Sequence, residues 1–217
     1  MEPPVDRSTT WPYVDGEPGP FYYARNAHPV GVEAERALGA LDGGEALLFA
    51  SGMGATTALL LTLAQQGATV ALAQDAYYGT GVLLGELERW GLRHVLFDQT
   101  GPAPESADLV WIEAPSNPLL TMPDFEAAAA HAAPVVCDAT AATPVHLRPL
   151  ELGCDFVLHS ATKYLAGHHD ALLGGVVCKD AAQAARLREV RTRTGIVAAP
   201  DAAWLLLRGL KTLEVRV

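Results

Sequence analysis

The 217-residue sequence predicts an α/β fold with a mostly parallel seven-stranded sheet and helices on both faces. Two observations favour this class. Apolar runs of strand length alternate with longer amphipathic stretches, as in chains built from strand–helix–strand crossovers. These runs are rich in β-branched residues and lack strict alternation of apolar and polar positions, which is typical of strands covered by helices on both faces.

The elements follow one another along the chain. Residues 1–30 are rich in proline, glycine and aromatic residues without periodicity, so we expect an extended arm that packs on another surface, such as another subunit. A helix is expected around Val32–Leu41. The expected buried strands are Ala46–Ala50, Thr69–Ala73, His94–Phe97, Asp108–Ile112, Pro134–Cys137, Asp155–His159 and Gly174–Cys178. Alanine-rich helices are expected at Gly54–Gln65, Asp124–Ala132 and Ala181–Arg188, and they offer little chemistry beyond packing.

Composition indicates a protein with a packed core and a small-molecule partner. Half of the residues are hydrophobic, 18% are charged, and the formal net charge is −10. Without a cluster of lysine and arginine, nucleic-acid binding is not expected. No apolar stretch reaches the ~20 residues of a membrane span, and the start lacks the features of a secretion signal, so a cytoplasmic location is expected.

The three cysteines, Cys137, Cys154 and Cys178, are widely spaced and form no C-x-x-C motif. Their number is odd, and neither a disulfide framework nor a zinc site requires this spacing. We therefore expect three buried thiols.

Polar residues follow the carboxyl ends of the expected strands, where open α/β sheets bind ligands. Because these ends meet at one edge of a parallel sheet, we expect the residues to lie close together. They are Ser51–Met53, Asp75, Tyr77, Tyr78, Ser116, Asn117, Asp138, Thr140, Ser160, Thr162 and Lys163.

Three short motifs in the sequence suggest other chemistry. Gly52–Gly54 with Asp75 resembles the start of a dinucleotide fingerprint, but Thr57 stands at the third glycine position, and a tight turn explains the glycines equally well. Ser160–Lys163 matches the S-x-x-K motif of acyl-serine hydrolases, whose partner motifs are absent. His168–Asp170 lacks a second pair of ligands at helical spacing, so no metal site is expected.

A lysine and an aspartate at neighbouring strand ends match the needs of pyridoxal 5'-phosphate (PLP). PLP requires an amine for a Schiff base, a carboxylate beside its ring nitrogen, donors for its phosphate and an aromatic face. Lys163 and Asp138 supply the first two, the helix start at Ser51–Gly54 offers N–H groups, and Tyr78 offers a ring. A nicotinamide site would leave Lys163 unexplained.

Seven segments also carry a family resemblance: YYAR (22–25), FASGMGA (49–55), DAYYGT (75–80), EAPSNP (113–118), CDATAATP (137–144), RPLELGCDFVLHSATKYLAGHHD (148–170) and LLLRGLKTL (205–213). Through them the sequence resembles the Cys/Met-metabolism (transsulfuration) family of PLP enzymes. This family includes cystathionine γ-synthase, cystathionine γ- and β-lyases, methionine γ-lyase and O-acylhomoserine sulfhydrylases. The resemblance implies the large domain of a fold-type I PLP enzyme that performs γ-elimination or γ-replacement on amino acids, with β-elimination as the rival.

The resemblance also implies a role for individual residues. Lys163 would carry the Schiff base and move protons, Asp138 would pair with the ring nitrogen, and Tyr78 would cover the ring and act in acid–base steps. The other implied cofactor-binding residues are Gly52, Met53, Ser160 and Thr162 at the phosphate, Tyr23 and Arg25 at the phosphate of a neighbouring subunit, Asn117 near the phenolic oxygen, and Thr140. Such sharing implies a homo-oligomer, a dimer of dimers.

The sequence departs from the family pattern in two places. His28 and Val30 replace an asparagine and a threonine, and Ala139 and Ala141 replace an asparagine and a phenylalanine. Neither change touches the implied cofactor anchors.

The expected domain organisation is an arm and helix over 1–45 that contact a neighbouring subunit, and a PLP-binding large domain over 46–217. Residues 201–217 predict a helix whose apolar face nothing C-terminal covers, and the C-terminal substrate domain of the relatives, with its carboxylate-binding arginine, is expected to be absent. A PLP-binding remnant without turnover is therefore an alternative.

Overall fold

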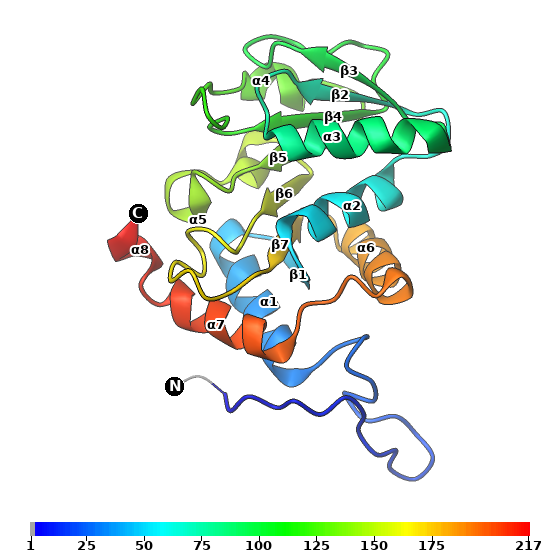
Figure 1. The fold of residues 1–217 in the computed structure, drawn as a ribbon, viewed down its shortest axis with the longest axis vertical. Coiled ribbons are helices and arrows are strands. Elements are labelled where there is room, and N and C mark those ends of the chain that lie inside the picture. The colour runs from blue at the N-terminus through cyan, green and yellow to red at the C-terminus, as the bar shows by residue number, and fades with distance from the viewer. Residues whose placement is uncertain (1–2) are drawn as a thin grey trace.

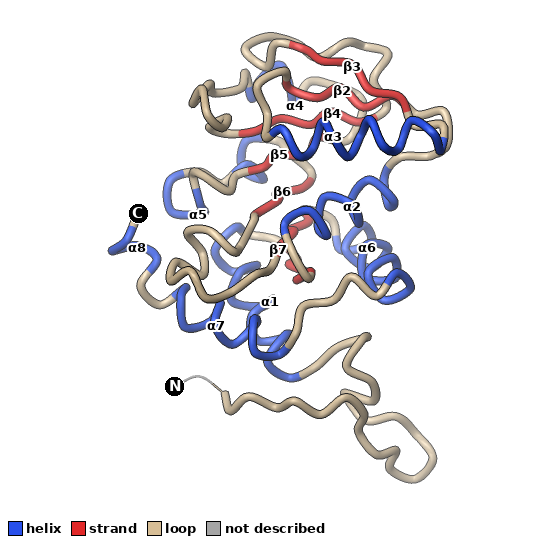
Figure 2. Tube along the Cα trace, viewed as in Figure 1, coloured by secondary structure: helices blue, strands red, loops and turns tan. Residues whose placement is uncertain are grey.

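Residues 3–217 are described by a computed structural model, in which a seven-stranded sheet carries helices on both faces (Figures 1 and 2). The strand order is β1-β7-β6-β5-β4-β2-β3. Every neighbouring pair is parallel except the two pairs of β7, which runs antiparallel to β1 and β6. The predicted α/β class with a mostly parallel sheet is confirmed.

The strands are β1 (Glu45–Phe49), β2 (Thr69–Ala73), β3 (Arg93–Phe97), β4 (Leu109–Glu113), β5 (Val135–Asp138), β6 (Phe156–His159) and β7 (Gly174–Cys178). Each predicted strand lies within one residue of these bounds. The expectation that all of them are buried is wrong for β3. Because β3 lies at the sheet edge, its Val95 and Leu96 side chains are exposed.

The helices are α1 (Pro29–Asp42), α2 (Gly52–Leu63), α3 (Tyr78–Leu87), α4 (Phe125–Ala129), α5 (Thr143–His146), α6 (Ala181–Thr194), α7 (Pro200–Leu210) and α8 (Leu213–Arg216), with 3-10 turns η1 (Glu88–Trp90) and η2 (Pro149–Leu152). Two apolar clusters divide them between the faces of the sheet. One cluster joins the sheet to α1, α4, α5, α7 and α8, and the other joins it to α2, α3 and α6. Helix α3 was not expected, because its three glycines lower helix propensity.

The C-terminal helix corrects one expectation. The predicted helix over 201–217 is two helices, α7 and α8, and the apolar face of α7 is covered by this chain's own α1. Ala203 and Leu206 are completely buried in the cluster that α1 shares. Gly209 lies so close to the Lys163 loop that an added Cβ would come within 2.3 Å of the Ala166 carbonyl oxygen. The apolar face therefore does not point to a missing covering segment.

The N-terminal arm (residues 3–28) contains no helix and runs along the body before projecting from it in Figure 1. Its start is tied to α7, because Arg7 pairs with Asp201 and the Trp204 indole donates to the Pro3 carbonyl. Farther along, Tyr13 and Val14 are 57% and 64% exposed. Contact with a neighbouring subunit stays a prediction.

Two further observations concern the described residues. Cys137, Cys154 and Cys178 are buried free thiols, as predicted. Within residues 3–217, no helix combines the length and the apolar character that a bilayer crossing requires.

Candidate active site

The N-terminus of α2 lies at the carboxyl edge of the sheet, directly after β1. Ser51 caps it, since its hydroxyl accepts a hydrogen bond of 2.9 Å from the Gly54 N–H. The Gly52 and Met53 N–H groups have no partner among the described residues. A Cβ at Gly52 would lie 3.0 Å from the Ser160 Cβ and Oγ atoms. The missing side chain therefore lets the helix start approach the turn after β6.

Asp138 ends β5 at the same edge and is only 8% exposed. Its Oδ1 accepts hydrogen bonds from the Thr140 N–H at 3.0 Å and the Thr140 hydroxyl at 2.6 Å. Thr140 Oγ1 accepts in turn from the Ser160 N–H at 2.7 Å. Burial raises the pKa of the Asp138 carboxyl, against the opposing effects of Thr140 and the charge of His159. Thr140 thus joins the end of β5 to the turn after β6 and leaves Asp138 Oδ2 without a hydrogen bond in residues 3–217.

Lys163 lies in the tight turn that follows β6, with an exposed side chain. Its N–H donates to the Ser160 carbonyl at 2.9 Å, and its own carbonyl accepts from the Gly167 N–H at 2.8 Å. The Thr162 hydroxyl exchanges two hydrogen bonds of 3.1 Å with the backbone of Leu173, at the entrance to β7. The turn is therefore held at both ends while the lysine side chain stays accessible.

Tyr78 begins α3 beyond the end of β2 and is 76% exposed. The rings of Tyr77 and Tyr78 contact each other at a centroid distance of 4.9 Å, and burial together with Tyr78 raises the pKa of Tyr77. Asn117 lies exposed in the loop after β4. The structure therefore brings both predicted residues to the carboxyl edge that holds Asp138 and Lys163.

Glu113, the last residue of β4, is a buried polar residue of this edge that the sequence analysis did not single out as a site residue. Its Oε2 accepts from the Tyr77 N–H at 2.5 Å and its Oε1 from the Asn117 N–H at 2.9 Å. It also lies beside Asp138 in the β4–β5 register. Burial first, and then the charge of Asp138, raise its pKa to about 8. The sequence feature that could have identified Glu113 is an acidic residue at the end of an otherwise apolar strand.

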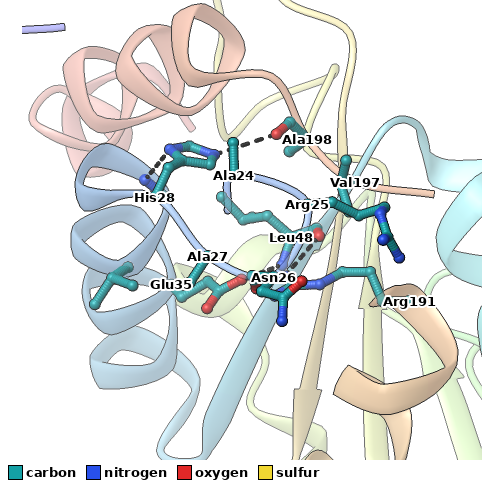
Figure 3. Close-up of a pocket in the computed structure, with 12 residues that line it drawn as sticks. Ala24, Arg25, Asn26, Ala27, His28, Glu35, Leu48, Arg191, Val197 and Ala198 are labelled. Atoms are coloured by element: carbon teal, nitrogen blue, oxygen red, sulfur yellow. Dashed lines mark hydrogen bonds and ion pairs between the residues drawn. The ribbon is translucent and has the colours of Figure 1, made fainter. Parts of the chain in front are cut away.

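Arg25 lies elsewhere, at the arm root, which we define as residues 24–28 with Glu35 and Arg191 (Figure 3). Tyr23 lies beside it, just before the arm root. The Arg25 guanidinium covers the Tyr23 ring at 5.1 Å and donates to the Thr192 carbonyl at 2.6 Å. Within residues 3–217 of one chain, no contact joins either residue to Lys163 or Asp138. The structure does not bring these two predicted residues to the carboxyl edge.

Buried Arg191 organises the arm root. Figure 3 shows its guanidinium paired with Glu35 and directed at backbone oxygens, with donation to the Leu48 carbonyl at 3.0 Å and to the Asn26 carbonyl at 3.2 Å. His28 closes the other side, where Nε2 lies 3.2 Å from the Ala198 carbonyl and Nδ1 accepts from the Gly31 N–H. The end of the arm is therefore fixed to β1, α1 and α6.

The motif His168–Asp170 lies in the loop between β6 and β7. Asp170 forms an ion pair of 2.8 Å with Arg208, and His168 Nδ1 lies 2.7 Å from the Ala166 carbonyl. In the described part of the chain, no group of three His, Cys, Asp or Glu side chains is arranged to hold a metal ion.

Comparisons with known proteins agree with this geometry. The family model described as Cys/Met metabolism PLP-dependent enzyme matches residues 1–217. The L-methionine gamma-lyase of Streptomyces avermitilis is 41% identical over 99% of this chain and 57% of its own length. Cystathionine beta-lyase MetC of Bacillus subtilis is 37% identical over 92% of this chain and 54% of its own length.

The crystal structure of cystathionine gamma synthase from Xanthomonas oryzae pv. oryzae in complex with cystathionine superposes with a TM-score of 0.93 and 35% identity. The match covers 98% of this chain and 58% of that one. The chain thus spans between half and two thirds of the length of the relatives it matches. It belongs to the Cys/Met metabolism family of PLP-dependent enzymes.

Proposed function

We propose that this chain binds PLP at the carboxyl edge of the sheet and forms the cofactor-binding part of an enzyme of sulfur amino-acid metabolism. The reaction we propose is elimination or replacement at the γ-carbon of an amino-acid substrate. Family membership supports the cofactor and the substrate class. The observation that carries the proposal is the hydrogen-bonded link Asp138–Thr140–Ser160, which joins the carboxylate to the turn that bears Lys163.

The residues at this edge suit the three functional groups of PLP. A phosphate suits the unpaired N–H groups of Gly52 and Met53, at the positive end of the 12-residue helix α2, with Ser160 and Thr162 beside them. A positively charged ring nitrogen suits Asp138, because an opposite charge offsets the burial that raises the pKa of this carboxyl. The amine of Lys163 suits the aldehyde.

In the proposed reaction, bound PLP supplies an electron sink for the negative charge that develops at the substrate's α-carbon. Asp138, fixed through Oδ1 by Thr140, presents Oδ2 to hold the ring nitrogen in its protonated form. Lys163 Nζ removes the α-proton, and removal of a second proton from Cβ lets the γ-substituent leave. Tyr78 would cover the cofactor ring and exchange protons, and Asn117 would lie near its phenolic oxygen.

β-Elimination is the second candidate reaction, because one relative carries the name cystathionine beta-lyase. Cystathionine itself separates the two. Elimination on its γ side, followed by hydrolysis of the enamine product, releases cysteine, 2-oxobutanoate and ammonia, whereas elimination on its β side releases homocysteine, pyruvate and ammonia. The identity of the released 2-oxo acid therefore decides between γ-elimination and β-elimination.

We further propose a homo-oligomer, a dimer of dimers, in which Tyr23 and Arg25 complete the phosphate site of a neighbouring copy. The exposed aromatic residues of the arm support an intermolecular role, since exposed apolar surface favours association. Mixed assemblies of Arg25→Ala and Lys163→Ala chains should regain a minority of intact sites. We place the enzyme in the cytoplasm, in keeping with its three free thiols.

The direct test is to add PLP, record the visible spectrum, reduce with borohydride and map the labelled peptide. The lysines of the chain are Lys163, Lys179 and Lys211. Lys179 is the control, because it follows the antiparallel strand β7 and so lies at the opposite edge of the sheet. We expect the label on Lys163 alone. A label on Lys179 or Lys211, or no label, would overturn the proposed cofactor site.

A further inference from the structure

The carboxyl group of Glu113 joins two loops that are distant in sequence. One oxygen accepts from the N–H of Tyr77, the residue before α3, and the other accepts from the N–H of Asn117, in the loop after β4. Tyr77 directly precedes Tyr78, to which we assign a contact with PLP. Asn117 is itself a residue to which we assign such a contact. A single side chain therefore sets the backbone at two places of the proposed cofactor site.

Gln99 fixes the backbone of Glu113 in turn. This side chain is 1% exposed, and it accepts from the Glu113 N–H at 3.0 Å and donates to the Glu113 carbonyl at 2.9 Å. Its amide also donates to the Thr121 carbonyl at 3.3 Å, which closes the loop that contains Asn117. The strand end is thus held in place, and the Glu113 carboxyl group has a defined direction.

A carboxylate is the side chain that meets both contacts. Each partner is an N–H donor, so the side chain must offer two acceptor oxygens, whereas an amide offers one acceptor and one donor. Hydrogen bonds to an ionised acceptor are also shorter and stronger than those to a neutral one. The geometry therefore favours glutamate over glutamine at this position.

The surroundings make this glutamate costly to bury. Asp138 faces it from β5, and Asp75, which accepts from the Ser116 hydroxyl at 2.7 Å, faces it from the β2–α3 turn. Burial and these two carboxylates favour the protonated form, while the N–H groups of Tyr77 and Asn117 favour the ionised form. Burial of this carboxyl group is energetically unfavourable, yet the group contacts both loops. These contacts indicate a positioning role.

We propose that Glu113 is a positioning residue of the PLP site: its carboxyl group fixes the backbone at Tyr77 and Asn117, and thereby places the Tyr78 ring and the Asn117 side chain. This inference rests on the proposed function. Ionised Glu113 holds both loops more firmly than protonated Glu113, so the placement tightens as pH rises through the pKa of about 8.

The first test compares the PLP affinity of wild-type protein, Glu113→Gln and the control Glu105→Gln at about pH 6.5 and about pH 9. Glu105 is an exposed loop residue, so the control makes the same change of charge away from the site. At the higher pH, Glu113→Gln should bind PLP about threefold to tenfold more weakly than wild type, the effect of one lost hydrogen bond. At the lower pH the gap should narrow, because protonated glutamate resembles glutamine, and Glu105→Gln should follow wild type throughout.

Equal PLP affinity of Glu113→Gln and wild type at both pH values would overturn the inference. If wild type itself binds no PLP, the proposed function fails instead, so the two failures are distinguishable.

The second test uses wild-type chain without PLP and requires no variant to fold. The Glu113 carboxyl carbon and the backbone amides of Tyr77 and Asn117 are followed by NMR as pH is raised. We expect one shared midpoint, well above the ordinary range of glutamate. Amide signals that do not move with the Glu113 carboxyl would show that it does not hold these loops, and would reject the inference.

Discussion

Buried ionisable side chains have different partners at the arm root and at the carboxyl edge of the sheet. At the arm root, Arg191 is buried together with its counter-ion Glu35 and two backbone carbonyls. At the carboxyl edge, Glu113 and Asp138 are buried side by side, and neither forms an ion pair with lysine or arginine in the described part of the chain. The first arrangement is balanced by itself, whereas the second lacks a cation, so the pKa values of both carboxyl groups are raised and a cationic ring would favour their ionised forms.

This difference indicates which residues stabilise the fold and which are suited to bind a ligand. Balanced pairs lose stability when one member is removed. Unbalanced carboxylates are destabilising in the protein alone and become favourable when a positive group binds. Stability measurements without ligand should therefore separate the two regions.

The largest effect is expected for Arg191→Ala, which leaves Glu35 buried without its cation. We expect a loss of about 3–5 kcal/mol in the free energy of unfolding. Arg193→Ala, on the same helix, is the matched control, because its pair with Glu189 is 76% and 62% exposed and should contribute about 0.5 kcal/mol or less. Urea unfolding measures both, and similar losses for the two variants would contradict the proposed balance at the arm root.

The next effect is a pH dependence from Glu113. The fold raises its pKa from 4.5 to about 8, so the folded chain keeps a proton that the unfolded chain releases. Its stabilising contribution is fully present below pH 4.5 and is lost as pH rises through about 8. We expect a loss of the order of a few kcal/mol across this window, measured by urea unfolding. Glu113→Gln should show a flatter profile, and parallel profiles would argue against the raised pKa.

Thr140→Val should have a smaller effect, and it tests the hydrogen bonds that Thr140 makes at the carboxyl edge. It removes the hydroxyl that donates to Asp138 and accepts from Ser160, at an expected loss of about 2 kcal/mol in the free energy of unfolding. PLP affinity should fall as well, since Asp138 is then held by one hydrogen bond fewer. Thr140→Ser keeps the hydroxyl and should retain most of both properties; a defect as large as that of valine would rule out the hydrogen-bonded link.

The smallest effect compares two helix caps. Ser51 caps α2 at the carboxyl edge and Asp180 caps α6 at the opposite edge, each with a hydrogen bond of 2.9 Å. Replacement of either by alanine should lower the free energy of unfolding by about 1 kcal/mol. Only Ser51→Ala should also weaken PLP binding in a spectral titration. A weaker affinity in Asp180→Ala would mean that the binding site is not confined to the carboxyl edge.

The sequence predicted the parts of the fold that depend on local pattern. The strands β2 and β7 are apolar runs with clear ends, and their predicted bounds agree with the structure. The carboxyl edge could be assembled in advance, because strand ends of a parallel sheet meet at one edge, although Lys163 and Asp138 are far apart in the chain.

Long-range contacts between backbone and side chains could not be predicted. Glu113 binds N–H groups, which no side-chain motif records, and Arg191 meets Glu35 across 156 residues of sequence. The contact between α7 and α1 could not be predicted for the same reason, because α1 lies near the other end of the chain. The position of Tyr78 was predicted. Helix α3, which begins at Tyr78, was not predicted, because its glycines lower helix propensity.

The reversed direction of β7 has a consequence for how this protein can vary. Because β6 ends and β7 begins at the same edge, residues 160–173 form an omega-like loop with both of its ends anchored there. The Thr162–Leu173 hydrogen bonds fix the neck of this loop beside Lys163, while the tip, which we define as His168 and His169, is exposed. Insertions, deletions and proteolytic nicks should therefore be tolerated at the tip, because the clamped neck keeps the lysine in register with the strands.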